Sequence, residues 1–126
     1  MISVLLFCES RYPVNRKAIR KTVEAVLGEK GVNGNIEVSI SIVGDRKMRT
    51  LNKKYRQKDE TADVLSFSQI EGEKIPNPDG ILRLGDIALS FPQVRRNAGK
   101  KEVLIDEEVN MLIRHSLLHL LGIHHE

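Results

Sequence analysis

Apolar positions along the chain predict a sheet of about four strands. Residues 2–8 form a short, nearly continuous apolar run, which is typical of a buried strand. Residues 36–42 alternate apolar and polar side chains, the period-two pattern of a half-buried strand. Two further strands are expected at residues 64–67 and 81–90, separated by a proline-containing loop at 72–80.

Helical spacing of apolar side chains predicts helices between these strands and after the last one. The first helix begins at a cap residue, Asn15, and ends near Gly31, and the second is capped by Asp45. Pro92 fits the first turn of a short helix, where the N–H that proline lacks is not needed. A long final helix is expected at about residues 101–121, with acidic side chains in its early turns that suit the helix dipole.

The mixture of strands and helices predicts one small α/β (α+β) domain over residues 1–126, with a roughly four-stranded mixed sheet and packed helices. A chain of 126 residues has the size of a single domain and can bury a core without disulfide bonds. Its one cysteine, Cys8, indicates a reducing compartment or a small buried side chain. The apolar run at 2–8 is too short to span a membrane and lacks the features of a secretory signal, so we expect a cytoplasmic protein.

Positive charge is concentrated in the second predicted helix, although the formal net charge of the whole chain is only +3. Residues 46–58 contain seven basic side chains and no acidic one. They are Arg46, Lys47, Arg49, Lys53, Lys54, Arg56 and Lys58. Such a cluster is either an ordinary solvated helix face or a surface that binds the phosphates of a nucleic acid. The cluster alone does not decide between these two interpretations.

All four histidines lie between positions 115 and 125. His115 and His119 are four residues apart in the predicted helix, so they project from one face and can share a metal ion. Gly122 can end the helix in a left-handed turn, which lets His125 return as a third ligand. Three histidines leave one position of a tetrahedral Zn²⁺ open, as catalytic zinc sites do. The sequence therefore predicts one zinc ion at the end of the long C-terminal helix.

Two details of this segment refine the metal hypothesis. His124 adjoins the third ligand and is expected to point elsewhere, as a second-shell group or proton carrier. Metzincin proteases have the same histidine spacing, but a glutamate that acts as general base follows their first histidine, and Ser116 stands there in this chain. A zinc peptidase is therefore the less favoured of the hydrolase interpretations. The alternative to a functional metal site is that these are ordinary core histidines, or that the terminal His-His-Glu binds metal adventitiously.

Three blocks of the sequence resemble the YbeY family, metal-dependent endoribonucleases that are specific for single strands and act in ribosomal RNA maturation. The first block is LNKKYRQKD at 51–59, which runs on into ADVLSF at 62–67. The second is LGDIALS at 84–90, and the third is the histidine segment. Where the family usually has an aspartate before the last histidine, this chain has His124.

The resemblance implies an α/β fold with the metal at the end of the long helix. It implies that His115, His119 and His125 bind zinc and that Arg56 is a functional arginine in the cleft. Arg56 and His115 are thus the predicted catalytic residues, while Asp86 is either a second-shell carboxylate or a structural one. Relatives act in the cytoplasm on the 3′ end of 16S ribosomal RNA and in ribosome quality control.

The leading hypothesis is a zinc endoribonuclease that acts on single-stranded ribosomal RNA, with the ribosome or its small subunit as partner. Arg56 holds the phosphate because a guanidinium fork matches phosphate oxygens, and the remaining basic residues of 46–58 recruit the strand. Neither a membrane nor a nucleotide cofactor is expected. The alternative from another class is an RNA-binding ribosome-assembly factor whose metal is structural.

Overall fold

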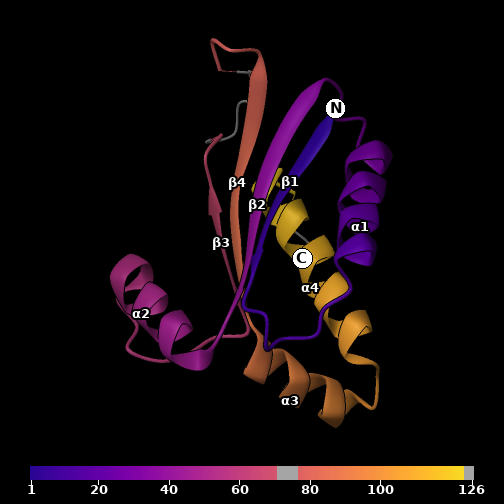
Figure 1. The fold of residues 1–126 in the computed structure, drawn as a ribbon. Coiled ribbons are helices and arrows are strands. Elements are labelled where there is room, and N and C mark those ends of the chain that lie inside the picture. The colour runs from indigo at the N-terminus through magenta and orange to yellow at the C-terminus, as the bar shows by residue number, and fades with distance from the viewer. Residues whose placement is uncertain (71–76, 124–126) are drawn as a thin grey trace.

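The computed structural model describes residues 1–70 and 77–123, which form a four-stranded sheet with helices on both faces (Figure 1). In chain order the elements are β1 (Ile2–Cys8), α1 (Arg16–Glu29), β2 (Asn35–Val43), α2 (Asp45–Arg56), β3 (Val64–Ser68), β4 (Ile81–Ser90), α3 (Phe91–Lys101) and α4 (Ile105–Leu120). Among the described residues, no helix is both long enough and apolar enough to cross a membrane.

The sheet confirms the predicted mixed architecture, with the strand order β1-β2-β4-β3. β1, β2 and β4 run parallel, and β3 pairs antiparallel with β4 at the edge. The alternation expected in β2 is present, because its four isoleucine and valine side chains at 36, 38, 40 and 42 are buried and the residues between them are less so. The other edge of β3 pairs with no strand of the described chain, and the candidate site lies along it.

The helices cover the two faces of the sheet unequally. α1 and α4 cover one face and pack against each other, α2 lies on the opposite face, and α3 lies near one end of the sheet (Figure 1). The main core fills the space between the sheet and the α1–α4 pair. A smaller cluster of Met48, Leu65 and Ala88 joins α2 to the other face. This second face is only partly covered, and it carries the exposed side chains of Leu5 and Phe7.

The start of α1 confirms the predicted cap, and the start of α2 corrects one. The side chain of Asn15 accepts a hydrogen bond from the backbone N–H of Ala18 at 3.0 Å. Asp45 was expected to cap α2, but it is the first helical residue and Gly44 occupies the cap position. The carboxylate of Asp45 instead accepts hydrogen bonds from the side chains of Thr61, Ser90 and Gln93.

The predicted final helix at about residues 101–121 is present as α4, but it begins later than expected because Lys101 still belongs to α3. α3 continues to Lys101 and ends because Glu102 adopts the left-handed conformation, with φ of 57°. α4 then begins at Ile105, with the expected acidic residues in its first turn. The ammonium of Lys101 donates to the carboxylate of Glu108 at 2.9 Å, and Glu108 is only 2% exposed. This ion pair links the two helices across the break.

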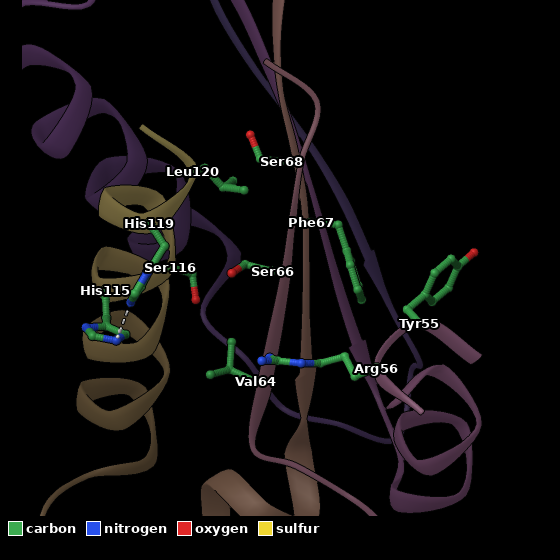
Figure 2. Close-up of a pocket in the computed structure, with 10 residues that line it drawn as sticks. All are labelled: Tyr55, Arg56, Val64, Ser66, Phe67, Ser68, His115, Ser116, His119 and Leu120. Atoms are coloured by element: carbon green, nitrogen blue, oxygen red, sulfur yellow. Dashed lines mark hydrogen bonds between the residues drawn. The ribbon is translucent and has the colours of Figure 1, made fainter. Parts of the chain in front are cut away.

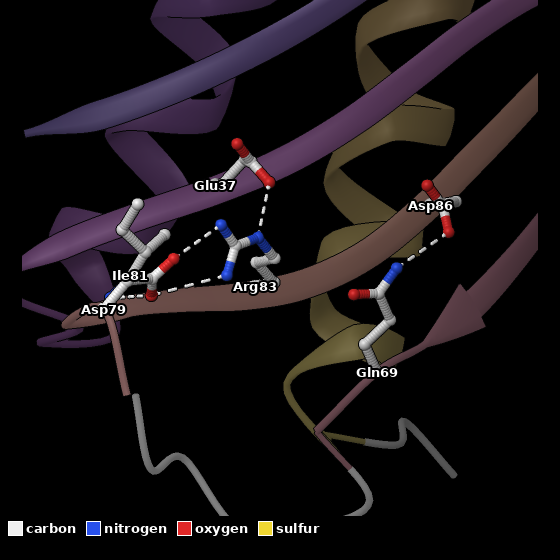
Figure 3. Close-up of polar contacts among 6 residues, drawn as sticks. All are labelled: Glu37, Gln69, Asp79, Ile81, Arg83 and Asp86. Atoms are coloured by element: carbon white, nitrogen blue, oxygen red, sulfur yellow. Dashed lines mark hydrogen bonds and ion pairs between the residues drawn. The ribbon is translucent and has the colours of Figure 1, made fainter. Parts of the chain in front are cut away.

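A β-bulge in β4 decides which way the following side chains point. The pairing register with β2 shifts so that Val38 lies opposite Gly85 rather than Leu84. Gly85 has φ of 143°, and a Cβ added to it would collide with the backbone carbonyl of Phe67. Only glycine fits here without strain. The extra residue reverses the alternation beyond it, so Asp86 faces the α2 side of the sheet (Figure 3).

Candidate active site

A cavity of about 520 Å³ wraps around the free edge of β3. α4 forms one wall and the end of α2 forms the other, so segments far apart in the sequence meet there (Figure 2). The residues that line it are Tyr55, Arg56, Val64, Ser66, Phe67, Ser68, His115, Ser116, His119 and Leu120. The described lining contains no carboxylate, so this part of the wall is neutral or positive.

His115 and His119 share the exposed face of α4, as their spacing predicts. Their Nε2 atoms lie 3.0 Å apart, and the two rings meet edge to face with centroids 4.5 Å apart. Two ligand nitrogens on a tetrahedral zinc ion, with bonds of about 2.0–2.1 Å, are separated by about 3.3 Å. A small rotation of either ring would give that separation, so this pair fits two corners of a zinc site.

The left-handed turn that was expected at Gly122 is also present. Gly122 has φ of 78°, its N–H donates to the carbonyl of His119 at 3.0 Å, and the N–H of Ile123 donates to that of Leu118 at 2.8 Å. The predicted third ligand, His125, and its neighbour His124 lie outside the described residues. Within 1–70 and 77–123, no group of three His, Cys, Asp or Glu side chains is arranged to hold a metal ion. Of the three predicted ligands, the structure thus describes only His115 and His119.

Arg56 is the last residue of α2 and reaches into the cavity from the side opposite α4. The helix ends there because Gln57 is left-handed, with φ of 56°. The buried Asn52 then donates from Nδ2 to the carbonyl of Glu60 at 2.9 Å, which fastens the loop after the helix. The Arg56 side chain extends from α2 toward Val64, in the direction of α4 (Figure 2). It makes no ion pair within the described chain, so its guanidinium is available to a bound anion.

The other basic residues of the second helix are divided between different cavities and the open surface. A shallow groove of about 560 Å³ is lined by Arg46, Arg49, Thr50, Lys53, Lys54 and Asp59. Arg49 donates from Nε to the carboxylate of Asp59 at 2.7 Å, so part of its charge is already neutralised. Lys47 lines a different cavity on the α2 side of the sheet, and Lys58 is exposed just beyond the end of α2.

Asp86 lies on the opposite face of the sheet from the histidine pair and does not contact it. Its carboxylate accepts a hydrogen bond from Nε2 of Gln69 at 3.1 Å and lines the cavity on the α2 side (Figure 3). The bulge at Gly85 is the physical reason, because simple alternation would have turned Asp86 toward α4. No contact within the described chain supports a second-shell role for Asp86 at the histidine pair.

Serine side chains of β3 and α4 also line the cavity. The hydroxyls of Ser66 and Ser116 point toward one another between β3 and α4 (Figure 2). Ser116 is only 2% exposed, and Ser68 lies further along the same edge. The period-two pattern of β3 already places Val64, Ser66 and Ser68 on one face, but only the packing of α4 shows that this face lines a cavity.

The backbone of β3 also presents hydrogen-bonding groups to the cavity. Ser90 donates its N–H to the carbonyl of Asp63 at 2.9 Å, and Gln69 donates to the carbonyl of Leu84 at 3.0 Å. In an antiparallel pair, alternate residues bond to the partner strand, so the odd-numbered residues of β3 face β4. The N–H and carbonyl groups of Ser66 and Ser68 therefore point to the free edge, beside the histidines and Arg56.

Comparison with known proteins identifies a family whose sequences this chain matches. The family model described as "Endoribonuclease YbeY" matches residues 8–126. A relative named Endoribonuclease YbeY from Aquifex aeolicus is 41% identical over 113 residues, which are 90% of this chain and 71% of that protein. One of the same name from Moorella thermoacetica is 36% identical over 125 residues, covering 94% of this chain and 80% of its own.

A solved structure supports the fold independently. The solution structure of TM1509 from Thermotoga maritima matches all of this chain and 75% of its own chain, with a TM-score of 0.65 and 24% sequence identity. At that level of identity the similarity concerns the fold alone.

Proposed function

This chain belongs to the YbeY family of endoribonucleases, and from that membership we propose that it is a zinc-dependent enzyme that cuts single-stranded ribosomal RNA. The proposed process is maturation of the 3′ end of 16S ribosomal RNA and ribosome quality control in the cytoplasm, with the small ribosomal subunit as partner. The observation that carries the proposal is the meeting of Arg56 with the His115–His119 pair in one cavity.

Arg56 is suited to hold the scissile phosphate. Its guanidinium can donate two parallel hydrogen bonds to phosphate oxygens, and these bonds strengthen as negative charge builds on the oxygens in the transition state. The absence of a carboxylate from the described lining removes a source of repulsion for the incoming anion. Arg56 therefore binds the substrate and stabilises the charge that develops during cleavage.

The residues that would hold the zinc ion are His115 and His119, with His125 as the predicted third ligand. The 3.0 Å separation of the two Nε2 atoms supports this assignment. A zinc ion bound there would supply Lewis-acid stabilisation of the phosphoryl oxygens and would lower the pKa of a water molecule. His115 acts at the reaction centre as one of these ligands, and Ser116 beside it offers no carboxylate base of the kind that a metalloprotease requires.

The free edge of β3 is suited to position the RNA backbone. The outward N–H groups and the hydroxyls of Ser66 and Ser68 can donate hydrogen bonds to phosphate or sugar oxygens. A groove along α2, lined by Arg46, Lys53 and Lys54, adds positive charge, and its two lysines lie in the same last turn as Arg56. A single strand is the form of RNA that can follow such an edge, since its backbone bends freely.

Cleavage of a labelled single-stranded RNA tests the proposed function. Protein loaded with zinc is expected to cut the RNA, and His119→Ala is expected to abolish cleavage while circular dichroism shows a folded chain. Met111→Ala is the matched control, because Met111 is 42% exposed on the same helix and lies outside the cavity. It should cut at the wild-type rate.

Other outcomes would decide against the proposal. Undiminished cleavage by His119→Ala would show that the nuclease activity belongs elsewhere. Unfolding by a chelator, with no cleavage under any metal, would favour a ribosome-assembly factor whose metal is structural. Chelator-sensitive hydrolysis of casein without RNA cleavage would favour a peptidase.

A further inference from the structure

A second cavity adjoins the histidine cavity on the other side of β3. It has a volume of about 370 Å³ and is lined by Ser41, Val43, Lys47, Leu51, Tyr55, Phe67, Asp86, Ile87 and Ala88. Tyr55 and Phe67 line both cavities, so this aromatic pair forms the boundary between them. Figure 2 shows the pair on the side of β3 that faces away from the histidines.

Tyr55 is held in an exposed position rather than packed into the core. Its ring centroid lies 5.0 Å from that of Phe67, with the planes inclined at 53°, and the ammonium of Lys54 lies 5.1 Å from its centre. The side chain nevertheless remains 53% exposed. Tyr55 directly precedes Arg56 in the sequence, so its ring projects from the residue next to the one proposed to hold the phosphate.

The lining of the second cavity favours a flat, uncharged group over a phosphate. Most of its side chains are apolar, and its polar groups include Ser41, Lys47 and Asp86. A carboxylate in the wall repels a phosphate, but it can accept a hydrogen bond from the N–H edge of a nucleobase. One oxygen of Asp86 is already bonded to Gln69, which fixes the carboxylate at the rim (Figure 3). Ligand sites commonly combine such apolar walls with a few placed polar groups.

We propose that Tyr55, supported by Phe67, stacks on the nucleobase next to the phosphate held by Arg56, and that the second cavity receives this base. The proposal rests on the proposed RNA substrate. The strand then crosses the edge of β3, with its phosphate on the histidine side and one base on the α2 side. A base in a duplex is paired and stacked on its neighbours, so only an unpaired nucleotide can bind in this way. Tyr55 is thus a determinant of single-strand specificity.

The chain contains its own control for this test. Tyr12 stacks on Phe91 with centroids 4.8 Å apart and has the guanidinium of Arg11 4.9 Å from its ring, much as Lys54 approaches Tyr55. Tyr12 lines neither of the two cavities. Since the chain has two tyrosines and no tryptophan, Tyr12→Phe leaves Tyr55 as the only strong fluorophore, and Tyr55→Phe leaves Tyr12.

The first measurement is tyrosine fluorescence during titration with oligouridylate, in chelator so that the RNA stays intact and with circular dichroism to verify the fold. Stacking is expected to quench the emission of Tyr12→Phe, which reports on Tyr55, and to leave that of Tyr55→Phe unchanged. Absorption by the RNA affects both variants alike, so it cannot produce the difference. Equal quenching in the two variants, or quenching by an abasic oligomer of the same length, would overturn the proposal.

The second measurement is the affinity of three variants for the same two oligomers. Base–aromatic stacking predicts that Tyr55→Leu binds oligouridylate about tenfold to a hundredfold more weakly, while Tyr55→Phe and Tyr12→Leu bind as wild type does. All four proteins should bind the abasic oligomer equally. An undiminished affinity of Tyr55→Leu for oligouridylate, or an equal loss for the abasic oligomer, would contradict the subsite. If RNA quenches the tyrosine emission of wild type but wild type never cuts RNA, the base subsite is supported and the proposed nuclease activity is contradicted.

Discussion

The position of the Arg56 guanidinium fits the phosphate-binding role proposed for it. It is exposed at the last residue of α2 and makes no ion pair with the rest of the described chain. The nearby Arg49 is different, because it already bonds to Asp59. An unpaired arginine beside two histidines keeps its hydrogen-bonding capacity for a substrate. Its removal should therefore change activity much more than folding.

Substitution of Arg56 separates charge from geometry. We expect Arg56→Ala to lower kcat for RNA cleavage by about a hundredfold or more, as loss of a charge-stabilising donor does in other enzymes. Arg56→Lys keeps the charge but loses the planar fork, so its kcat should lie between those of Arg56→Ala and wild type. The free energy of unfolding of both variants should lie within about 0.5 kcal/mol of that of wild type, because the side chain is exposed. A large loss of stability with an unchanged kcat would assign Arg56 a structural role.

At the scale of elements, the break between α3 and α4 depends on a residue in an unfavourable conformation. Glu102 has φ of 57°, a region in which a side chain is strained and glycine is not. Its backbone N–H caps α3 by donating to the carbonyl of Gly99 at 3.3 Å. The turn is therefore stabilised by the packing of the two helices around it.

Glu102→Gly should stabilise the protein by about 0.5–1 kcal/mol, because it relieves this strain. Chemical denaturation with urea would measure the gain. Glu102→Ala is the matched control, since it removes the carboxylate but keeps the Cβ, and it should give no gain. Equal stabilisation by both variants would attribute the effect to charge rather than to backbone conformation.

Asp45 joins α2 to the start of α3 and to the loop before β3. Burial raises the pKa of its carboxyl group, but hydrogen bonds from Ser90, Gln93 and Thr61 lower it more, so the net pKa is below the ordinary value of 3.8. The ionised form is thus favoured in the folded state. Its contribution to stability is complete above the ordinary pKa and is lost as the pH falls through the lower pKa of the folded protein.

Asp45→Asn should destabilise the fold by about 1–3 kcal/mol at pH 7, because its amide cannot accept all of these hydrogen bonds. The difference from wild type should stay constant between pH 6 and pH 8 and shrink below about pH 4. Urea denaturation across this range measures it. A difference that does not change down to pH 3 would contradict a role for the ionised carboxylate.

The elements that could be predicted are those that depend on local pattern. The four strands and the cap of α1 follow from alternation and from the side chain of Asn15, and the pairing of His115 with His119 follows from helical spacing alone. The break at Glu102 and the bulge at Gly85 could not be predicted, because tertiary packing imposes both. The side of the sheet on which Asp86 lies could not be predicted for that reason, and the positions of Ser66 and Tyr55 at the cavity could not, because α2 and α4 meet β3 only in the folded chain.

At the scale of the whole molecule, the basic residues beside the site differ in how readily they can bind a phosphate. Lys53 and Arg49 line the same groove, but Arg49 is paired with Asp59 at 2.7 Å. Each lysine that contacts a phosphate releases about 0.7 of a counterion from a single strand. Arg49 must first leave its partner, so it can contribute less.

The salt dependence of RNA binding tests this difference. We expect Lys53→Ala to reduce the slope of log affinity against log salt concentration by about 0.7, uniformly across RNA sequences. Arg49→Ala should reduce it by less. Fluorescence anisotropy at several salt concentrations provides both slopes. If Arg49→Ala had the larger effect, the groove would bind RNA in a different orientation from the one inferred.

The whole site exists only because the sheet leaves the edge of β3 free between two helices. α4 brings the histidines, α2 brings Arg56 and Tyr55, and β3 itself presents serine hydroxyls and backbone groups. Each part is local, but the cavity is a property of the complete fold. The central claim is that this one cavity cuts unpaired RNA.

The most direct test is single-turnover cleavage of one end-labelled RNA, free and annealed to its complement, by zinc-loaded wild type and Arg56→Ala. Wild type should cut the free strand rapidly and the duplex little, and Arg56→Ala should cut the free strand about a hundredfold more slowly. Equal cleavage of both RNA forms, or an unchanged rate in Arg56→Ala, would contradict the central claim.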